Sequence, residues 1–180
     1  EIVGKARVRM WVDRVYYYSI RFDSPYQVKE ALPLRHEAEK AHRYVLSFDL
    51  PKNGELKVKA SVSRTSIENA QRNIDSEISG WNFSEVRTAA LDKWTDLLER
   101  VRIKGTTEQK NIFYSAMYKL CIHPNNVADV GEDVRFSTLS LWDTYRAAHP
   151  LYTILAPEKV NDFVRSMLAQ YHDEGCLPIW

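Results

Sequence analysis

The sequence predicts a fold in which antiparallel β-strands come first and helices follow. Up to about residue 64, apolar and polar side chains alternate, which is the period of a strand with one buried face. Beyond that point apolar residues recur every three or four positions, which is the period of a helix. Glycine, asparagine and proline mark the turns of the first part, and helix-capping residues mark the second.

The alternating pattern occupies four stretches of the first part. They run from Ala6 to Val12, Tyr16 to Phe22, His42 to Phe48 and Leu56 to Val62. The polar segment from Glu30 to Lys40 is interpreted as a loop, and residues 51–54 carry a turn signal. Because such a sheet has no closing strands of its own, we expect it to be the end of a larger β-sandwich.

Each predicted helix of the second part has a start signal. The signals are Ser66, Asn82 with Glu85, Thr106 with Gln109, and Pro157. Gly175 is placed to end the last helix. A further helix is predicted over residues 139–149, stopping before Pro150 because proline disrupts a helix interior.

Composition excludes several classes of partner. The 180 residues carry a net charge of +1 with both signs well mixed, which does not favour binding to nucleic acid or to an anionic membrane. No apolar run approaches the roughly 20 residues that span a bilayer. Cys121 and Cys176 lack the cysteine and histidine spacing of a metal site, so no metal ligands are assigned, and they are either two thiols or one disulfide. The chain lacks an initiator methionine, and we expect it to be an internal piece of a longer protein.

The predicted helix over residues 139–149 carries the candidate functional residues. On one helix, Trp142, Tyr145 and Arg146 share a face, and Asp143 lies one turn before Arg146. A carboxylate can accept hydrogen bonds from vicinal sugar hydroxyls while an aromatic face covers the apolar C–H surface of the ring. The pattern therefore suits a sugar-binding surface.

A purely structural interpretation of the same helix is also open. Trp142 would then be a core residue, Asp143 and Arg146 an ordinary ion pair one turn apart, and His149 a cation at the helix C-terminus. His123 could face a cleft shared with this helix, whereas Asn125 and Asn126 are interpreted as a turn. The acidic residues do not have EF-hand spacing and are interpreted as a solvated loop: Asp129, Glu132 and Asp133.

Several motifs together resemble glycoside hydrolase family 92, the calcium-dependent exo-α-mannosidases. The most specific stretch is Ser140-Leu141-Trp142-Asp143-Thr144-Tyr145-Arg146, followed by His149-Pro150-Leu151 and Leu177-Pro178-Ile179-Trp180. Upstream, the resemblance includes Phe113-Tyr114-Ser115-Ala116-Met117-Tyr118, His123-Pro124-Asn125 and Ser66-Ile67-Glu68-Asn69-Ala70. The order of these motifs holds over nearly the whole chain.

The resemblance implies a particular architecture. Residues 1–64 would be the C-terminal edge of an N-terminal β-sandwich domain, residues 65–105 a helical linker, and residues 106–180 the helical hairpins that begin a truncated (α/α)₆ catalytic barrel. The remainder of the same chain would then be a partner of this piece. Placement outside the cell, in the periplasm or on the cell surface is implied by the family alone.

The resemblance also implies a reaction. The parent enzyme would remove terminal α-linked mannose, with α-1,2 as the first expectation, from mannose-containing N-glycans with inversion of configuration. Inversion uses an acid and a base roughly 6.5–9.5 Å apart with water between them. In the family these carboxylates and most calcium contacts lie downstream, so this piece would hold no catalytic residue or metal ligand and would be inactive alone.

Site residues follow from the motif by position. Trp142 and Asp143 would line the terminal-mannose subsite, with Trp180 near the same pocket and Arg146 and His123 as further candidates. Two other interpretations stay open: a non-catalytic carbohydrate-binding protein on the same scaffold, and a helical domain that binds no ligand.

Overall fold

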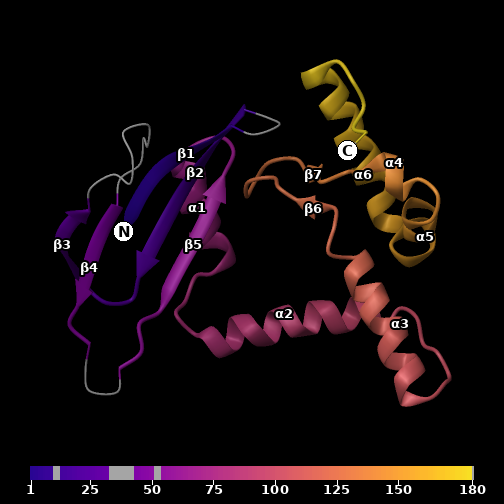
Figure 1. The fold of residues 1–180 in the computed structure, drawn as a ribbon, viewed down its shortest axis with the longest axis horizontal. Coiled ribbons are helices and arrows are strands. Elements are labelled where there is room, and N and C mark those ends of the chain that lie inside the picture. The colour runs from indigo at the N-terminus through magenta and orange to yellow at the C-terminus, as the bar shows by residue number, and fades with distance from the viewer. Residues whose placement is uncertain (10–12, 33–42, 51–53, 180) are drawn as a thin grey trace. The chain divides into compact units, whose positions relative to one another are not determined.

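The computed structural model describes residues 1–9, 13–32, 43–50 and 54–179, which form two compact units (Figure 1). Unit 1 comprises residues 1–81 and contains five strands and one helix, and unit 2 comprises residues 82–180 and is mainly helical. The β-then-α order predicted from the sequence is confirmed.

Unit 1 is built on a three-stranded antiparallel sheet in the order β1-β2-β5 (Ile2–Arg9, Asp13–Phe22 and Val58–Ser63). A separate hairpin pairs β3 (Tyr26–Leu32) with β4 (Arg43–Phe48). The rings of Phe22, Tyr26 and Phe48 lie 5.1–6.0 Å apart and join the hairpin to the end of β2.

The four predicted stretches overlap β1, β2, β4 and β5, whereas β3 was not predicted. Residues 30–32, which were assigned to a loop, are the end of β3, because their backbones pair with β4 even though their side chains are polar or exposed. The predictions for residues 10–12, 33–42 and 51–53 lie outside the described residues.

Helix α1 (Ile67–Glu77) begins at the predicted cap, where the Ser66 hydroxyl accepts a hydrogen bond from the Asn69 amide at 3.1 Å. The helix packs on the serine-rich face of the sheet. The Ser61 hydroxyl donates to the Ala70 carbonyl there, and Asn73 Nδ2 donates to the Val62 carbonyl at 3.1 Å.

An ion network ties the same face to the first residue of the chain. Arg21 Nε donates to Glu1 Oε1 at 2.7 Å, and the other end of the guanidinium pairs with Asp75 on α1. Ser19 and Gln71 also donate to the Glu1 carboxylate. The hydrogen bond from Arg21 is the main reason that the pKa values of Glu1 and Asp75 lie below their usual range.

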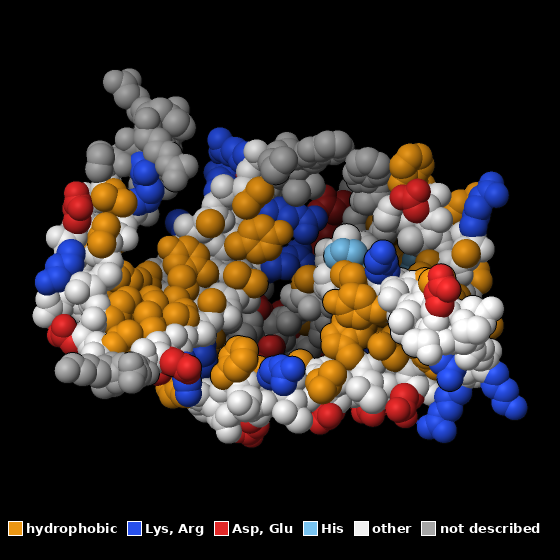
Figure 2. Space-filling model, turned by 60° about the horizontal axis from the view of Figure 1, so that its bottom comes forward, with side chains coloured by type: hydrophobic (Ala, Val, Ile, Leu, Met, Phe, Trp, Pro, Cys, Tyr) orange, Lys and Arg blue, Asp and Glu red, His pale blue; other side chains and the backbone are white. Residues whose placement is uncertain are grey.

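The opposite face of the sheet is apolar. Side chains alternate across a strand, so Tyr18, Ile20 and Phe22 point away from Ser19 and Arg21. Their cross-strand neighbours include Val62 and Val58, which are 65% and 52% exposed. Figure 2 shows hydrophobic side chains gathered over the strands of unit 1.

Unit 2 begins with two capped helices. In α2 (Phe83–Leu98) the Asn82 side chain accepts from the Glu85 amide, and in α3 (Thr107–Leu120) Thr106 and Gln109 form a complete capping box. A short hairpin follows, made of β6 (Asn125–Asn126) and β7 (Phe136–Ser137). The prediction of a turn at Asn125 and Asn126 is therefore wrong, because both residues are extended and paired.

Three helices complete unit 2: α4 (Leu141–Thr144), α5 (Ala148–Leu155) and α6 (Pro157–Glu174). As predicted, Pro157 starts α6 and Gly175 ends it in the left-handed region, with φ +76°. The rings of Tyr152 and Phe163 lie 5.6 Å apart, and Phe136 from β7 lies 4.7 Å from Phe163. This aromatic group is the core that positions the segment between β7 and α5.

Candidate functional site

The predicted helix over residues 139–149 is interrupted. Helix α4 ends at Thr144, a turn follows, and α5 begins at Ala148 with Pro150 in its first turn. The first amides of a helix have no intrahelical acceptor, so proline fits a helix start as well as a helix end. His149 is consequently at the N-terminal end of a helix, and its interpretation as a C-terminal cation is wrong.

The structure places Trp142 and Asp143 at the surface of unit 2. Trp142 is 56% exposed, which contradicts its interpretation as a core residue. Asp143 accepts a hydrogen bond from Ser140 Oγ at 3.0 Å. Arg146 instead donates through Nε to the Tyr145 hydroxyl at 2.9 Å, with its guanidinium 5.6 Å from the Tyr145 ring centre. The expected ion pair between Asp143 and Arg146 is therefore not formed.

Two parts of the motif that are distant in sequence meet here. The Trp142 amide donates to the Ile179 carbonyl at 3.0 Å, which holds the segment before Trp180 against the start of α4. Pro178 in that segment is buried. Trp180 itself lies outside the described residues, so its predicted role stays a prediction.

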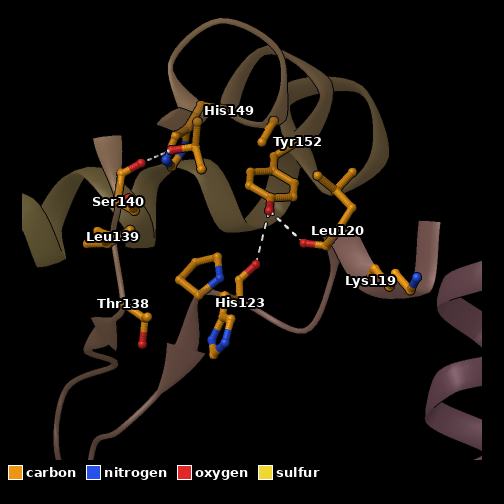
Figure 3. A pocket seen from close by; sticks show the side chains of 11 residues that line it. Lys119, Leu120, His123, Thr138, Leu139, Ser140, His149 and Tyr152 are labelled. Carbon is orange, nitrogen blue, oxygen red and sulfur yellow. Dashed lines mark hydrogen bonds between the residues drawn. The ribbon is translucent and has the colours of Figure 1, made fainter. Parts of the chain in front are cut away.

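His123 lies in a different place from Trp142 and Asp143. It lines a pocket of about 220 Å³ that also includes Ser140 and Thr144 but neither Trp142 nor Asp143 (Figure 3). The structure thus brings His123 close to Ser140 and Thr144 at the two ends of α4, but not to Trp142 and Asp143. Arg146 does not line this pocket.

Tyr152 organises one wall of the pocket. It is only 6% exposed, and its hydroxyl donates to the carbonyls of Leu120 at 2.9 Å and His123 at 3.0 Å (Figure 3). Leu120 is the last residue of α3 and His123 lies just beyond it, where carbonyls have no intrahelical donor. Burial raises the pKa of the Tyr152 hydroxyl, so it remains a donor at neutral pH.

Two further pocket residues were not predicted as site residues. Thr138 has φ +65°, an unfavourable backbone conformation for a β-branched residue. His149 is half-buried, and loss of solvent lowers the pKa of its imidazole. The His149-Pro150 pair was visible in the sequence, but its interpretation as a helix end moved it away from the pocket.

The remaining candidates are placed as follows. Asp129 is only 5% exposed, so its assignment to a solvated loop is wrong, whereas Glu132 and Asp133 are exposed as expected.

Cys121 and Cys176 are free thiols. In the described ranges of the chain, no three histidine, cysteine, aspartate or glutamate side chains converge on a metal position. No helix in those ranges is both long and apolar enough to span a bilayer.

Comparison with known protein families gives one family match. Residues 69–180 match the family model described as the glycosyl hydrolase family 92 catalytic domain. No curated protein matches the chain.

Comparison with solved structures gives three family GH92 structures with a similar fold. The family GH92 inverting mannosidase BT2199 from Bacteroides thetaiotaomicron VPI-5482 is similar over 99% of this chain with TM-score 0.82 and 23% identity. The family GH92 alpha-mannosidase BT3965 from Bacteroides thetaiotaomicron is similar over 93% with TM-score 0.76 and 27% identity. The gh92 family glycosyl hydrolase ccman5 is similar over 95% with TM-score 0.79 and 18% identity. The chain spans 28%, 27% and 26% of these three structures.

Proposed function

The chain belongs to glycosyl hydrolase family 92, and on this basis we propose that it is part of an inverting α-mannosidase. The substrate is terminal α-linked mannose of N-glycan-type mannosides, with α-1,2 as the first linkage to test. Two similar structures, a GH92 inverting mannosidase and a GH92 alpha-mannosidase, support this proposal.

The observation that carries the proposal is the exposed pair Trp142 and Asp143. Trp142 is 56% exposed, and an exposed indole can pack against the C–H face of a sugar ring. Asp143 accepts one hydrogen bond from Ser140, and its carboxylate has capacity for more. The hydrogen bond to Ile179 fixes this wall and carries the chain to Trp180, which we include in the same subsite.

We extend the proposal to the architecture. The apolar, exposed face of the sheet β1-β2-β5 supports placing residues 1–64 at the edge of a β-sandwich, because sandwich sheets pack through such faces. Residues 65–105 would be the linker, and residues 106–180 the first helices of an (α/α)₆ barrel.

Calcium and the catalytic carboxylates belong to the proposed remainder of the enzyme. The described residues offer no carboxylate set that fits calcium, so no step is assigned to the metal here. An exported location is likewise a proposal, which fractionation of the source cells would test.

Hydrolysis of a chromogenic α-mannoside and of an oligomannose tests the proposal. We expect no turnover by residues 1–180 and turnover with inversion by the longer enzyme, followed by NMR of the released anomer. Turnover by the 180-residue chain alone would contradict the placement of the acid and base outside it. An inactive longer protein that still binds mannosides would instead show a carbohydrate-binding protein on this scaffold.

A further inference from the structure

The pocket behind α4 is distinct from the surface that carries Trp142 and Asp143. It is lined by Ser140 and Thr144, which are four residues apart and so share one side of the short helix. Trp142 and Asp143 lie between them in sequence and do not line it. Because the pocket is not used by the proposed mannose subsite, its chemistry needs an explanation of its own.

The pocket is built from fixed elements. Leu139 and Tyr152 are 4% and 6% exposed, and the Tyr152 hydroxyl binds both carbonyls at the end of α3. Thr144 Oγ1 donates to the Ser140 carbonyl at 2.8 Å, which fixes the opposite wall. Such walls keep their shape when a ligand enters, so little ordering has to accompany binding.

The lining presents hydrogen-bonding groups with unused capacity. Within the described part of the chain, the His149 imidazole and the Thr138 hydroxyl have no hydrogen-bond partner. Asn125 Nδ2 lies 3.1 Å from His123 Nδ1, which leaves the other ring nitrogen, Nε2, available for a ligand. Burial lowers the pKa of the His149 imidazole, which favours the neutral ring with one donor and one acceptor.

This chemistry fits a neutral hydroxylated ligand better than an anion. Lys119 is the one formally charged residue among those that line the pocket, and phosphate sites normally combine several cations or backbone amides. Donors and acceptors side by side match sugar hydroxyls, which both donate and accept. Pro124 and Leu139 add apolar surface for ring C–H groups. The volume of about 220 Å³ lies below the roughly 300–1,000 Å³ of pockets for drug-sized ligands, so the occupant has to be small.

We propose that this pocket binds a single neutral pyranose unit, as a second saccharide site separate from Trp142 and Asp143. The proposal rests on the proposed function in that glycans are the ligands of the chain. It does not require that the pyranose be the sugar that is cleaved.

Titration of ¹⁵N-labelled chain with methyl α-mannoside, followed by NMR, tests the proposal because it reports each site separately. We expect shifts at Thr138 and the His149 imidazole, and separate shifts at the Trp142 indole; Ser140 is not used as a reporter because its hydroxyl also binds Asp143. His149→Phe keeps a ring beside Tyr152 but removes both nitrogens. The sugar affinity measured from the pocket resonances should therefore fall about tenfold, while the affinity measured from the Trp142 indole stays unchanged. Asp143→Asn should lower the affinity measured at the Trp142 indole and leave the affinity measured at Thr138 and His149 unchanged.

A second variant covers the case in which His149→Phe does not fold. Thr138→Gly removes the hydroxyl at a position where φ +65° suits glycine, so the fold is retained while the pocket shifts weaken. Pocket resonances that do not respond to the sugar, or that respond in both pocket variants as they do in the wild type, would overturn the proposal. Loss of the Trp142 response alone would count against the mannose subsite and leave the pocket assignment standing.

Discussion

Replacing Tyr152 by phenylalanine isolates the contribution of one hydroxyl to unit 2. The ring and its packing on Phe163 are kept, but the carbonyls of Leu120 and His123 lose their shared donor. A net hydrogen bond contributes about 0.5–1.5 kcal/mol, and unsatisfied buried acceptors add to the loss. We therefore expect destabilisation by about 1–2 kcal/mol.

Thermal unfolding followed by circular dichroism measures this change. For a unit of this size 1 kcal/mol corresponds to about 4–8 °C, so the expected fall in Tm is about 4–16 °C. Amide hydrogen exchange should accelerate most at Cys121 and Ile122, between the two released carbonyls.

Tyr118→Phe is the matched control. Tyr118 packs its ring 4.5 Å from Trp94, is 43% exposed, and its hydroxyl has no partner in the part of the chain that the structure describes. We expect a change below about 0.5 kcal/mol for this variant. Equal effects of the two substitutions would refute the assignment of Tyr152 as the group that fixes the end of α3.

Two other predictions concern stability. Because Arg21 holds the folded-state pKa values of Glu1 and Asp75 below their unfolded values, the network stabilises unit 1 at neutral pH, and this stability is lost as pH falls below about 5, measured as a falling urea midpoint. Ser166→Ala should destabilise unit 2 by about 1–3 kcal/mol in urea unfolding. The reason is that Ser166, 2% exposed, accepts from the Phe136 amide at 2.8 Å, and that amide would lose its partner.

Each of these has its own control. In Arg21→Gln the acid dependence of unit 1 should flatten, and an unchanged dependence would show that other carboxylates cause it. Ser115→Ala on the exposed side of α3 should change stability by less than about 0.5 kcal/mol. A Ser166→Ala effect no larger than this would contradict the role given to the Ser166 hydroxyl.

Helix starts were predictable because their signals are local. The cap at Ser66 and the capping box at Thr106 depend on groups three residues apart, so the sequence contains the whole interaction. Strand β3 (Tyr26–Leu32) was not predicted, because backbone pairing with β4 holds it and its side chains are mostly exposed.

The candidate site was predictable only in part. Pro150 is compatible with either end of a helix, and the sequence alone does not decide between them. The contacts that build the pocket are also not local: Tyr152 binds carbonyls 29 and 32 residues away, and Trp142 binds Ile179. The resemblance identified Trp142 and Asp143, but spacing alone could not show that their surface and the His123 pocket are separate.

The central claim is that Trp142 and Asp143 form a sugar-binding wall. Titration of the chain with methyl α-mannoside, read at the Trp142 indole resonance, tests it in wild type, Asp143→Asn and the exposed control Asp133→Asn. Loss of a charged acceptor should weaken binding at this resonance by at least about tenfold in Asp143→Asn, with Asp133→Asn unchanged. An indole resonance that does not shift on addition of the sugar, or that gives the same affinity in all three proteins, would contradict the account.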